Sequence, residues 1–218
     1  MALSREQIAQ RVAQELQDGY YVNLGIGIPT LVANYVPKGM DVMLQSENGL
    51  LGMGQFPNED EIDADLINAG KQTVTMATGA SVFNSAESFA MIRGGHVDLT
   101  VLGAFEVDVN GNIASYMIPG KLIKGMGGAM DLVAGADNII VTMTHASKHG
   151  VSKLLTKCSL PLTGKGCIKK VLTDLAFIEI KNGKFHLLER APGVSVEEIL
   201  TLTEGELMVS GDVPEMSF

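Results

Sequence analysis

One carboxylate, Glu47, stands where an open α/β protein would expose a reactive side chain. It follows the apolar residues 42–44, which read as the end of a buried strand, and it precedes Asn48 and Gly49. Both of these residues tolerate positive φ, so the chain can turn sharply after the strand. Strand ends of this kind line the ligand crevice of open α/β sheets. Glu47 is therefore a candidate reactive side chain, although a solvated surface charge is the ordinary alternative for such a residue.

Two glycine-containing turns are candidates for close contact with a ligand. Residues 25–29 (Gly-Ile-Gly-Ile-Pro) follow a strand-like segment, and Pro29 suits the first turn of a helix. Such a turn exposes backbone N–H groups and the positive end of a helix dipole. It is not a dinucleotide-binding fingerprint, because the third glycine and the acidic residue that binds ribose are missing. Taken alone the motif is weak evidence for a ligand site and favours a plain tight turn.

The second glycine-containing turn is a loop in residues 119–131. Its glycines are Gly120, Gly125, Gly127 and Gly128. Four glycines so close together would weaken any helix or strand, which favours a loop. A loop of this composition is useful where backbone N–H groups must reach a ligand.

Other chemistries have little support in the sequence. His145 and His149 are four residues apart, but Ala146 occupies the position where a zincin motif requires glutamate. The acidic segment 55–65 lacks the central glycine of a calcium loop, so we predict a solvated surface loop there. Cys158 and Cys167 are expected to be small buried side chains without a disulfide. We expect no metal and no permanently bound cofactor.

The order of predicted elements indicates how these groups are positioned. Ser4 begins a capping box and a first helix, Asn84 or Ser85 caps a second, and Ser195 caps a short third one ending near Leu202. Strands are predicted at residues 20–24, 39–44, 73–76, 97–102, 138–143, 177–180, 184–188 and 207–209, with hairpin turns at 110–111 and 181–184. Alternating strands and helices predict a single domain, 1–218, with one open, mostly parallel mixed sheet and helices on both faces. The tail beyond Ser210 is predicted to fray.

Bulk properties narrow the class of partner. The chain has 218 residues, 46% of them apolar, and a net charge of −9 without a basic block. Nucleic-acid binding needs a positive surface and is therefore not expected. No apolar run reaches membrane-spanning length, and residues 1–15 carry charges throughout, unlike a secretory leader. Together with only two cysteines, these features favour a reduced, cytoplasmic setting.

Several segments resemble one family in one order. The sequence Gln-Ser-Glu-Asn-Gly-Leu-Leu-Gly at 45–52 is similar to the active-site segment of the beta subunit of 3-oxoacid CoA-transferases, the family I CoA transferases. Further segments that look like this family are residues 22–30, 66–71, 88–96, 124–133 and 158–164. The similarity runs from about Arg5 to about Val209, which is far more specific than a lone glycine pattern.

The resemblance implies a fold, a mechanism and a set of site residues. The fold would be the NagB/RpiA/CoA transferase-like one. The carboxylate of Glu47 would form a glutamyl-CoA thioester, and the amide of Gly128 would stabilise the oxyanion. Residues implied to contact substrate or CoA are Asn23, Gly25, Gly27, Asn48, Gly49, Lys71 and Gly127.

The resemblance also implies a substrate class and a partner. Coenzyme A would be a substrate, and a separate alpha subunit would complete a heterodimer or heterotetramer, so the chain alone should be nearly inactive. Lys71 could pair with the second carboxylate of succinyl-CoA, with a 3-oxoacid such as acetoacetate as acceptor. Acetate or butyrate transfer to acetoacetate, acyl-CoA hydrolysis and a non-catalytic partner subunit remain alternatives.

Overall fold

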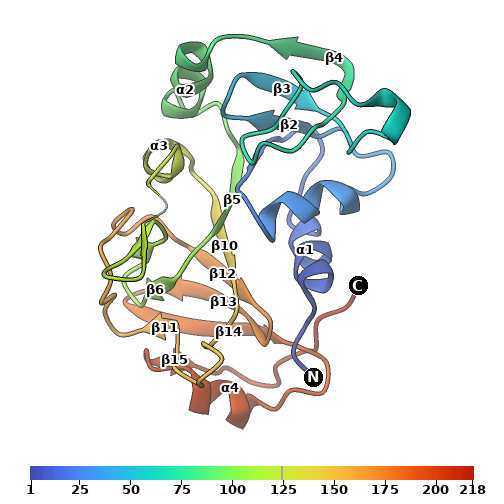
Figure 1. The fold of residues 1–218 in the computed structure, drawn as a ribbon. Helices are drawn as coiled ribbons and strands as arrows, with labels where there is room; N and C mark the ends of the chain where they lie inside the picture. Colours follow the sequence, from blue (N-terminus) through green and yellow to red (C-terminus); the bar gives the residue numbers. More distant parts are fainter. Residues whose placement is uncertain (124) are drawn as a thin grey trace.

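A ten-stranded mixed sheet is the frame of the protein, in a computed structural model that describes residues 1–123 and 125–218 (Figure 1). The strands lie in the order β15-β14-β13-β12-β10-β5-β1-β2-β3-β4. Their bounds are β1 Tyr21–Leu24, β2 Met43–Ser46, β3 Leu50–Met53, β4 Met76–Val82, β5 Leu99–Gly103, β10 Ile139–Met143, β12 Lys170–Thr173, β13 Ala176–Lys181, β14 Lys184–Arg190 and β15 Leu207–Met208. Two small sheets contain β6 Glu106–Asp108, β7 Ile113–Ala114 and β11 Leu154–Leu155, and β8 Met117–Ile118 with β9 Leu122–Ile123.

The middle of the large sheet is parallel and places several strand ends together. β2, β1, β5, β10 and β12 are neighbours in that order and all run the same way. The chain first adds β2 on one side of β1 and then returns to add β5 on the other side. Such a reversal opens a crevice at the carboxyl ends of the strands. Antiparallel strands flank this middle on both sides.

Helices lie on both faces of the sheet, as the alternating pattern predicts. The α-helix α1 (Arg5–Ala13) packs against the 3-10 helix η1 (Pro29–Tyr35) on one side of the central strands. On the other side, α2 (Ser85–Arg93) packs against α3 (Ala129–Gly135), as Figure 1 shows. A short 3-10 helix η2 (Glu59–Glu61) and the helix α4 (Val196–Leu202) complete the set of described helices.

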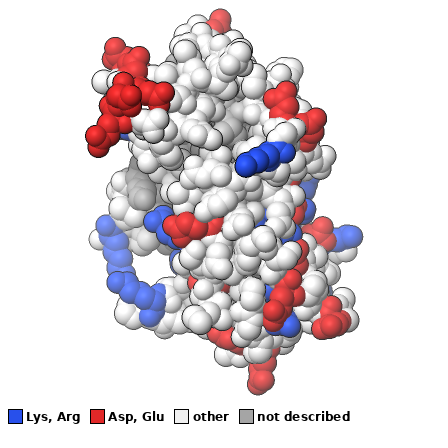
Figure 2. Space-filling view, turned by 90° about the vertical axis from the view of Figure 1, so that its right-hand side faces the viewer, with Lys and Arg blue, Asp and Glu red and all other residues white. Residues whose placement is uncertain are grey.

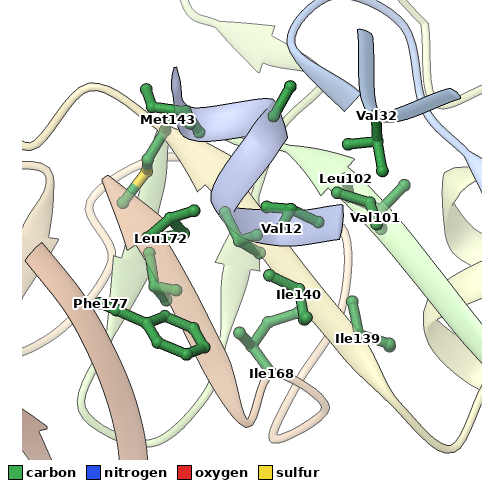
Figure 3. Close-up of a cluster of buried hydrophobic side chains, with 14 of the residues drawn as sticks. Val12, Val32, Val101, Leu102, Ile139, Ile140, Met143, Ile168, Leu172 and Phe177 are labelled. Atoms are coloured by element: carbon green, nitrogen blue, oxygen red, sulfur yellow. The ribbon is translucent and has the colours of Figure 1, made fainter. Parts of the chain in front are cut away.

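The core sits between α1 and the parallel strands (Figure 3). All five residues of β10 are buried, which is the behaviour of a strand covered on both faces. Val101 of β5 and Val12 of α1 lie against this strand in the same cluster. The cluster of buried apolar residues includes members from Leu3 to Met216, so both ends of the chain belong to it.

Local signals in the sequence match the local structure at most points. Ser4 forms the predicted capping box with Gln7, and Asn84 caps α2. The predicted hairpin turn between β13 and β14 contains Asn182 and Gly183, both at positive φ. The helix predicted after Pro29 is a 3-10 helix instead of an α-helix.

The prediction of a frayed tail beyond Ser210 is wrong. Val213 and Met216 are buried, with 4% and 3% of their surface exposed. The backbone N–H of Arg190 donates to the carbonyl of Pro214, and the N–H of Met216 donates to the carbonyl of Arg190. The polar residues between these apolar positions hide the anchoring pattern, because only tertiary packing shows that the two side chains reach the core.

The surface carries its charge unevenly. On the face shown in Figure 2, one group of acidic side chains lies at the upper left, and further acidic and basic side chains lie along the right and lower edges. The acidic segment 55–65 is largely exposed, which agrees with the predicted solvated loop. Within residues 1–123 and 125–218, the helices are too short or too polar to cross a membrane.

Candidate active site

The turn after β2 holds Glu47 at the carboxyl end of the parallel strands. Gly49 adopts φ of 119° and leads the chain back into β3. A Cβ atom at this position would overlap the carbonyl oxygen of Phe83, so the turn requires glycine for both conformation and space. The N–H of Phe83 in turn donates to the carbonyl of Gly49 at 3.0 Å. The residues before α2 therefore fix the turn that carries Glu47.

A cleft of about 740 Å³ opens beside Glu47. Its floor consists of the residues at the carboxyl ends of β1, β2, β5 and β10, and the loop before α3 forms a wall. This is the crevice that the reversal of strand order predicts. Among the lining residues are Asn23, Gly25, Gly27, Glu47, Gly127, Gly128, Thr142, Thr144 and Lys153.

Gly128 brings the glycine-rich loop against the carboxylate of Glu47. The backbone amide of Gly128 lies near that carboxylate and acts to lower its pKa. A Cβ atom on Gly128 would overlap the carboxylate oxygens, so glycine permits an approach that any other residue would block. Gly125 and Gly127 precede it at positive φ. Lys124, the first residue of the family-like segment 124–133, lies outside the described residues.

Burial raises the pKa of Glu47 above the ordinary value for a glutamate. The backbone amide of Gly128 acts in the opposite direction, and the nearby charge of Asp131 adds to the increase. Asp131 itself pairs with Arg93 of α2 at 2.7 Å. Glu47 is thus a partly desolvated carboxylate, and desolvation makes its charged form more reactive than a glutamate in bulk water.

The other predicted contact residues divide into two groups. Asn23, Gly25, Gly27 and Gly127 line the cleft with Glu47 and Gly128. Asn48, Gly49 and Lys71 are not among its lining residues. The structure therefore brings four of the seven predicted contact residues into the cleft with Glu47 and leaves the other three outside it.

Asn48, Asn23 and Lys71 have surroundings that the sequence does not reveal. The side-chain amide of Asn48 donates to the carbonyl of Ile67 at 2.7 Å, so it fastens the neighbouring loop. Asn23 is buried and donates to the side chain of Gln45 at 2.5 Å, which gives it a structural role beside any contact with substrate. Lys71 is exposed, with φ of 64°. Its pairing with a substrate carboxylate stays a prediction.

Several cleft residues were not predicted from the sequence. Arg5, Phe105, Tyr116 and Lys153 line the cleft but come from segments without a recognisable catalytic pattern. Thr142 and Thr144 had a detectable signal, because they lie at the carboxyl end of a predicted central strand. Lys153 reaches the cleft only because the chain folds back after β10, where its N–H donates to the carbonyl of His145.

His145 is buried for structural reasons. Its Nδ1 lies 2.9 Å from the hydroxyl of Thr173, and its Nε2 lies 2.9 Å from the hydroxyl of Thr203. Burial lowers the pKa of His145 to about 4, so the ring is neutral at physiological pH. Both ring nitrogens already have partners, and His149 is exposed to solvent.

Comparison with known proteins places this arrangement in a family. The sequence matches the family described as Coenzyme A transferase over residues 5–202. It is 57% identical over 213 residues to one subunit of a probable succinyl-CoA:3-ketoacid coenzyme A transferase of Bacillus subtilis, covering 98% of this chain and 99% of that protein. It is 59% identical to the corresponding subunit of the succinyl-CoA:3-ketoacid coenzyme A transferase of Helicobacter pylori strain 26695, covering 94% of this chain and 99% of that protein. The fold is similar to that of the acyl-CoA transferase YdiF of Escherichia coli O157:H7, with a TM-score of 0.78 at 24% identity over all of this chain and 45% of the other.

Proposed function

Because the chain belongs to the coenzyme A transferase family, we propose that it supplies the nucleophile for CoA transfer from succinyl-CoA to a 3-oxoacid such as acetoacetate. The observation that carries this proposal is the half-buried carboxylate of Glu47 in contact with the amide of Gly128, inside a cleft at the carboxyl ends of the central strands. The names of the relatives from Bacillus subtilis and Helicobacter pylori support the choice of substrates.

The first half of the reaction transfers CoA to the enzyme. A carboxylate oxygen of Glu47 attacks the thioester carbonyl, the C–S bond breaks, and CoA leaves as a thiolate. The product is a mixed anhydride between Glu47 and the acyl group. The thiolate then attacks the γ-carbonyl of Glu47, which releases the first acid as a carboxylate and leaves a glutamyl-CoA thioester. The acceptor acid runs the same two steps in reverse.

Glu47 meets the requirements of this chemistry without an adjacent base. A glutamate is ionised at neutral pH, and a carboxylate needs no proton removed before it attacks. A carboxylate is a weak nucleophile toward a thioester, so binding energy from the remote CoA handle must hold the two groups together. Partial burial also limits the access of water, which would hydrolyse the anhydride and the thioester.

Gly128 is suited to stabilise the charge that develops. When the thiolate attacks the γ-carbonyl, the oxyanion forms on an oxygen of Glu47 itself. The amide of Gly128 already lies beside this carboxylate in the resting protein. A preorganised donor of this kind lowers the activation free energy by roughly 3 kcal/mol. We therefore expect the same amide to stabilise first the resting carboxylate and then the tetrahedral oxyanion.

The proposal includes a separate alpha subunit as partner. It is supported by the names of the two bacterial relatives, each of which is called a subunit and is matched over 99% of its length. We expect the isolated chain to be nearly inactive and the two-subunit complex to carry out the full exchange. Coenzyme A enters and leaves as a substrate.

Trapping the intermediate tests the proposal directly. The reconstituted complex is incubated with succinyl-CoA, digested, and examined by mass spectrometry for a CoA adduct on the peptide that contains Glu47. The adduct is expected in the parent protein and in Glu59→Gln, a control at an exposed carboxylate. It should be absent in Glu47→Gln, and exchange should fall at least ~10³-fold. Normal exchange by Glu47→Gln would refute the proposal, and consumption of acyl-CoA without acceptor acid would indicate a hydrolase.

A further inference from the structure

A half-buried cation lies in the cleft without a carboxylate partner. The ammonium of Lys153 donates to the hydroxyl of Thr144 at 2.5 Å, and its side chain lines the cleft. Within the described residues, no Asp or Glu oxygen lies within ion-pair distance, 4.0 Å, of Lys153. Asp174 attracts this charge from farther away, and one of its oxygens is occupied by the N–H of His145 at 2.6 Å. A cation held in this way has capacity left for an anion.

A second polar group among the residues that line the cleft also lacks a partner. The hydroxyl of Thr142 is buried, with 2% of the residue exposed, and it makes no hydrogen bond to any described residue. Thr142 also lines the cleft. Thr142 and Thr144 are two residues apart at the end of β10, and residues at this spacing in an extended chain share a face. A buried hydroxyl without a partner costs free energy, so a ligand that accepts its hydrogen bond is favoured.

From these two observations we infer that Lys153 determines substrate specificity by binding the distal carboxylate of a dicarboxylic acyl group, with Thr142 as a second donor. The inference deepens the proposed function and rests on it, because it places the acyl chain between Glu47 and the end of β10. A monocarboxylic acyl group has no second carboxylate and gains nothing from this contact.

The experiment compares two donors that differ only in the distal carboxylate. Succinyl-CoA and butyryl-CoA have the same chain length and the same CoA handle. In the reconstituted complex, Lys153→Met should lower kcat/KM for succinyl-CoA roughly 10- to 100-fold, the usual effect of a lost charged hydrogen bond. The value for butyryl-CoA should change by less than ~3-fold, because this donor never makes the contact. Lys153→Arg should restore part of the preference.

Two further lysine variants serve as controls for the role of Lys153. Lys157→Met removes an exposed lysine four residues away and should leave both donors unchanged. Lys71→Met tests the other candidate for this contact: if Lys153 binds the distal carboxylate, Lys71→Met should affect the two donors equally. Equal losses for both donors in Lys153→Met would overturn the inference and assign the cation to the phosphates of CoA. Selective loss in Lys71→Met alone would overturn it as well. Failure to find an adduct on Glu47 with either donor would refute the proposed function instead.

Discussion

Partly buried charges are fully paired with opposite charges beneath α1 but are incompletely paired in the cleft. Beneath α1, Arg11 donates to both carboxylate oxygens of Glu189 and to Glu15, and Lys170 donates to Glu15 at 2.6 Å. Burial alone would raise the pKa of Glu15, but the hydrogen bonds and charges of Lys170 and Arg11 lower it below the ordinary value. In the cleft, burial raises the pKa of Glu47, and a single amide opposes this effect.

The full pairing beneath α1 favours stability, whereas the incomplete pairing in the cleft favours reactivity. The cluster formed by Arg11, Glu15, Lys170 and Glu189 leaves each charge with an opposite charge beside it. Glu47, Lys153 and Thr142 remain incompletely paired at the end of the parallel strands. Perturbed and underpaired groups that share a cleft are typical of functional sites. Substitutions in the two regions should therefore have different consequences, in catalysis for the cleft and in stability for the cluster beneath α1.

Of the changes that test this contrast, the closest approach in the cleft gives the largest expected effect. In Gly128→Ala, the new methyl group would overlap the carboxylate of Glu47 and displace the amide that serves the oxyanion. We expect a loss of about 10²-fold or more in the rate of adduct formation, measured by rapid quenching and mass spectrometry. Glu59→Gln, at an exposed carboxylate that does not line the cleft, is the control and should form the adduct at the parent rate. An unchanged rate in Gly128→Ala would show that the amide has no catalytic role.

The charge cluster beneath α1 should respond in stability and not in chemistry. Arg11→Met leaves Glu189 and one side of Glu15 unpaired in a partly buried position. We expect a decrease of about 3 kcal/mol in the free energy of unfolding, measured by urea denaturation at pH 7. Arg5→Met, at an exposed position of the same helix, should change it little. The rate per folded complex should be normal in Arg11→Met, and a selective loss of activity would contradict the contrast between the two regions.

The smallest effect is also the most diagnostic, because its sign differs between the two regions. A raised pKa means that ionised Glu47 opposes folding, so Glu47→Gln should increase the Tm of the isolated chain at pH 7. The gain should disappear as the pH falls below the raised pKa of Glu47, where the parent is protonated. Glu15 has a lowered pKa, so Glu15→Gln should decrease the Tm at pH 7. That loss should fade as the pH falls through the lowered pKa. Shifts of the same sign for both variants would refute the contrast.

The sequence predicts the local features of this fold better than its long-range ones. The cap at Ser4, the turn at Asn182 and the glycine at 49 follow from short-range conformational preferences, and the structure confirms them. The packing of Val213 and Met216 depends on contacts with residues far away in the chain, so the tail was mispredicted.

For the candidate site too, the sequence predicts poorly those features that depend on long-range contacts. Glu47 and Gly128 lie in family-like segments, and the structure brings these segments into contact. Lys153 belongs to no such pattern, because its place in the cleft depends on how the chain returns after β10. The family resemblance implies that Asn48 contacts the ligand, and the structure adds that its side-chain amide donates to the carbonyl of Ile67.

The close packing around the turn at Gly49 has a practical consequence for protein engineering. Because the carbonyl of Phe83 occupies the space of a side chain at that position, changes at 47–49 or 83 would move the nucleophile itself. Phe105 and Tyr116 reach the cleft from a different part of the chain. Libraries that aim to alter acyl-chain preference should therefore vary these two positions and keep the turn constant.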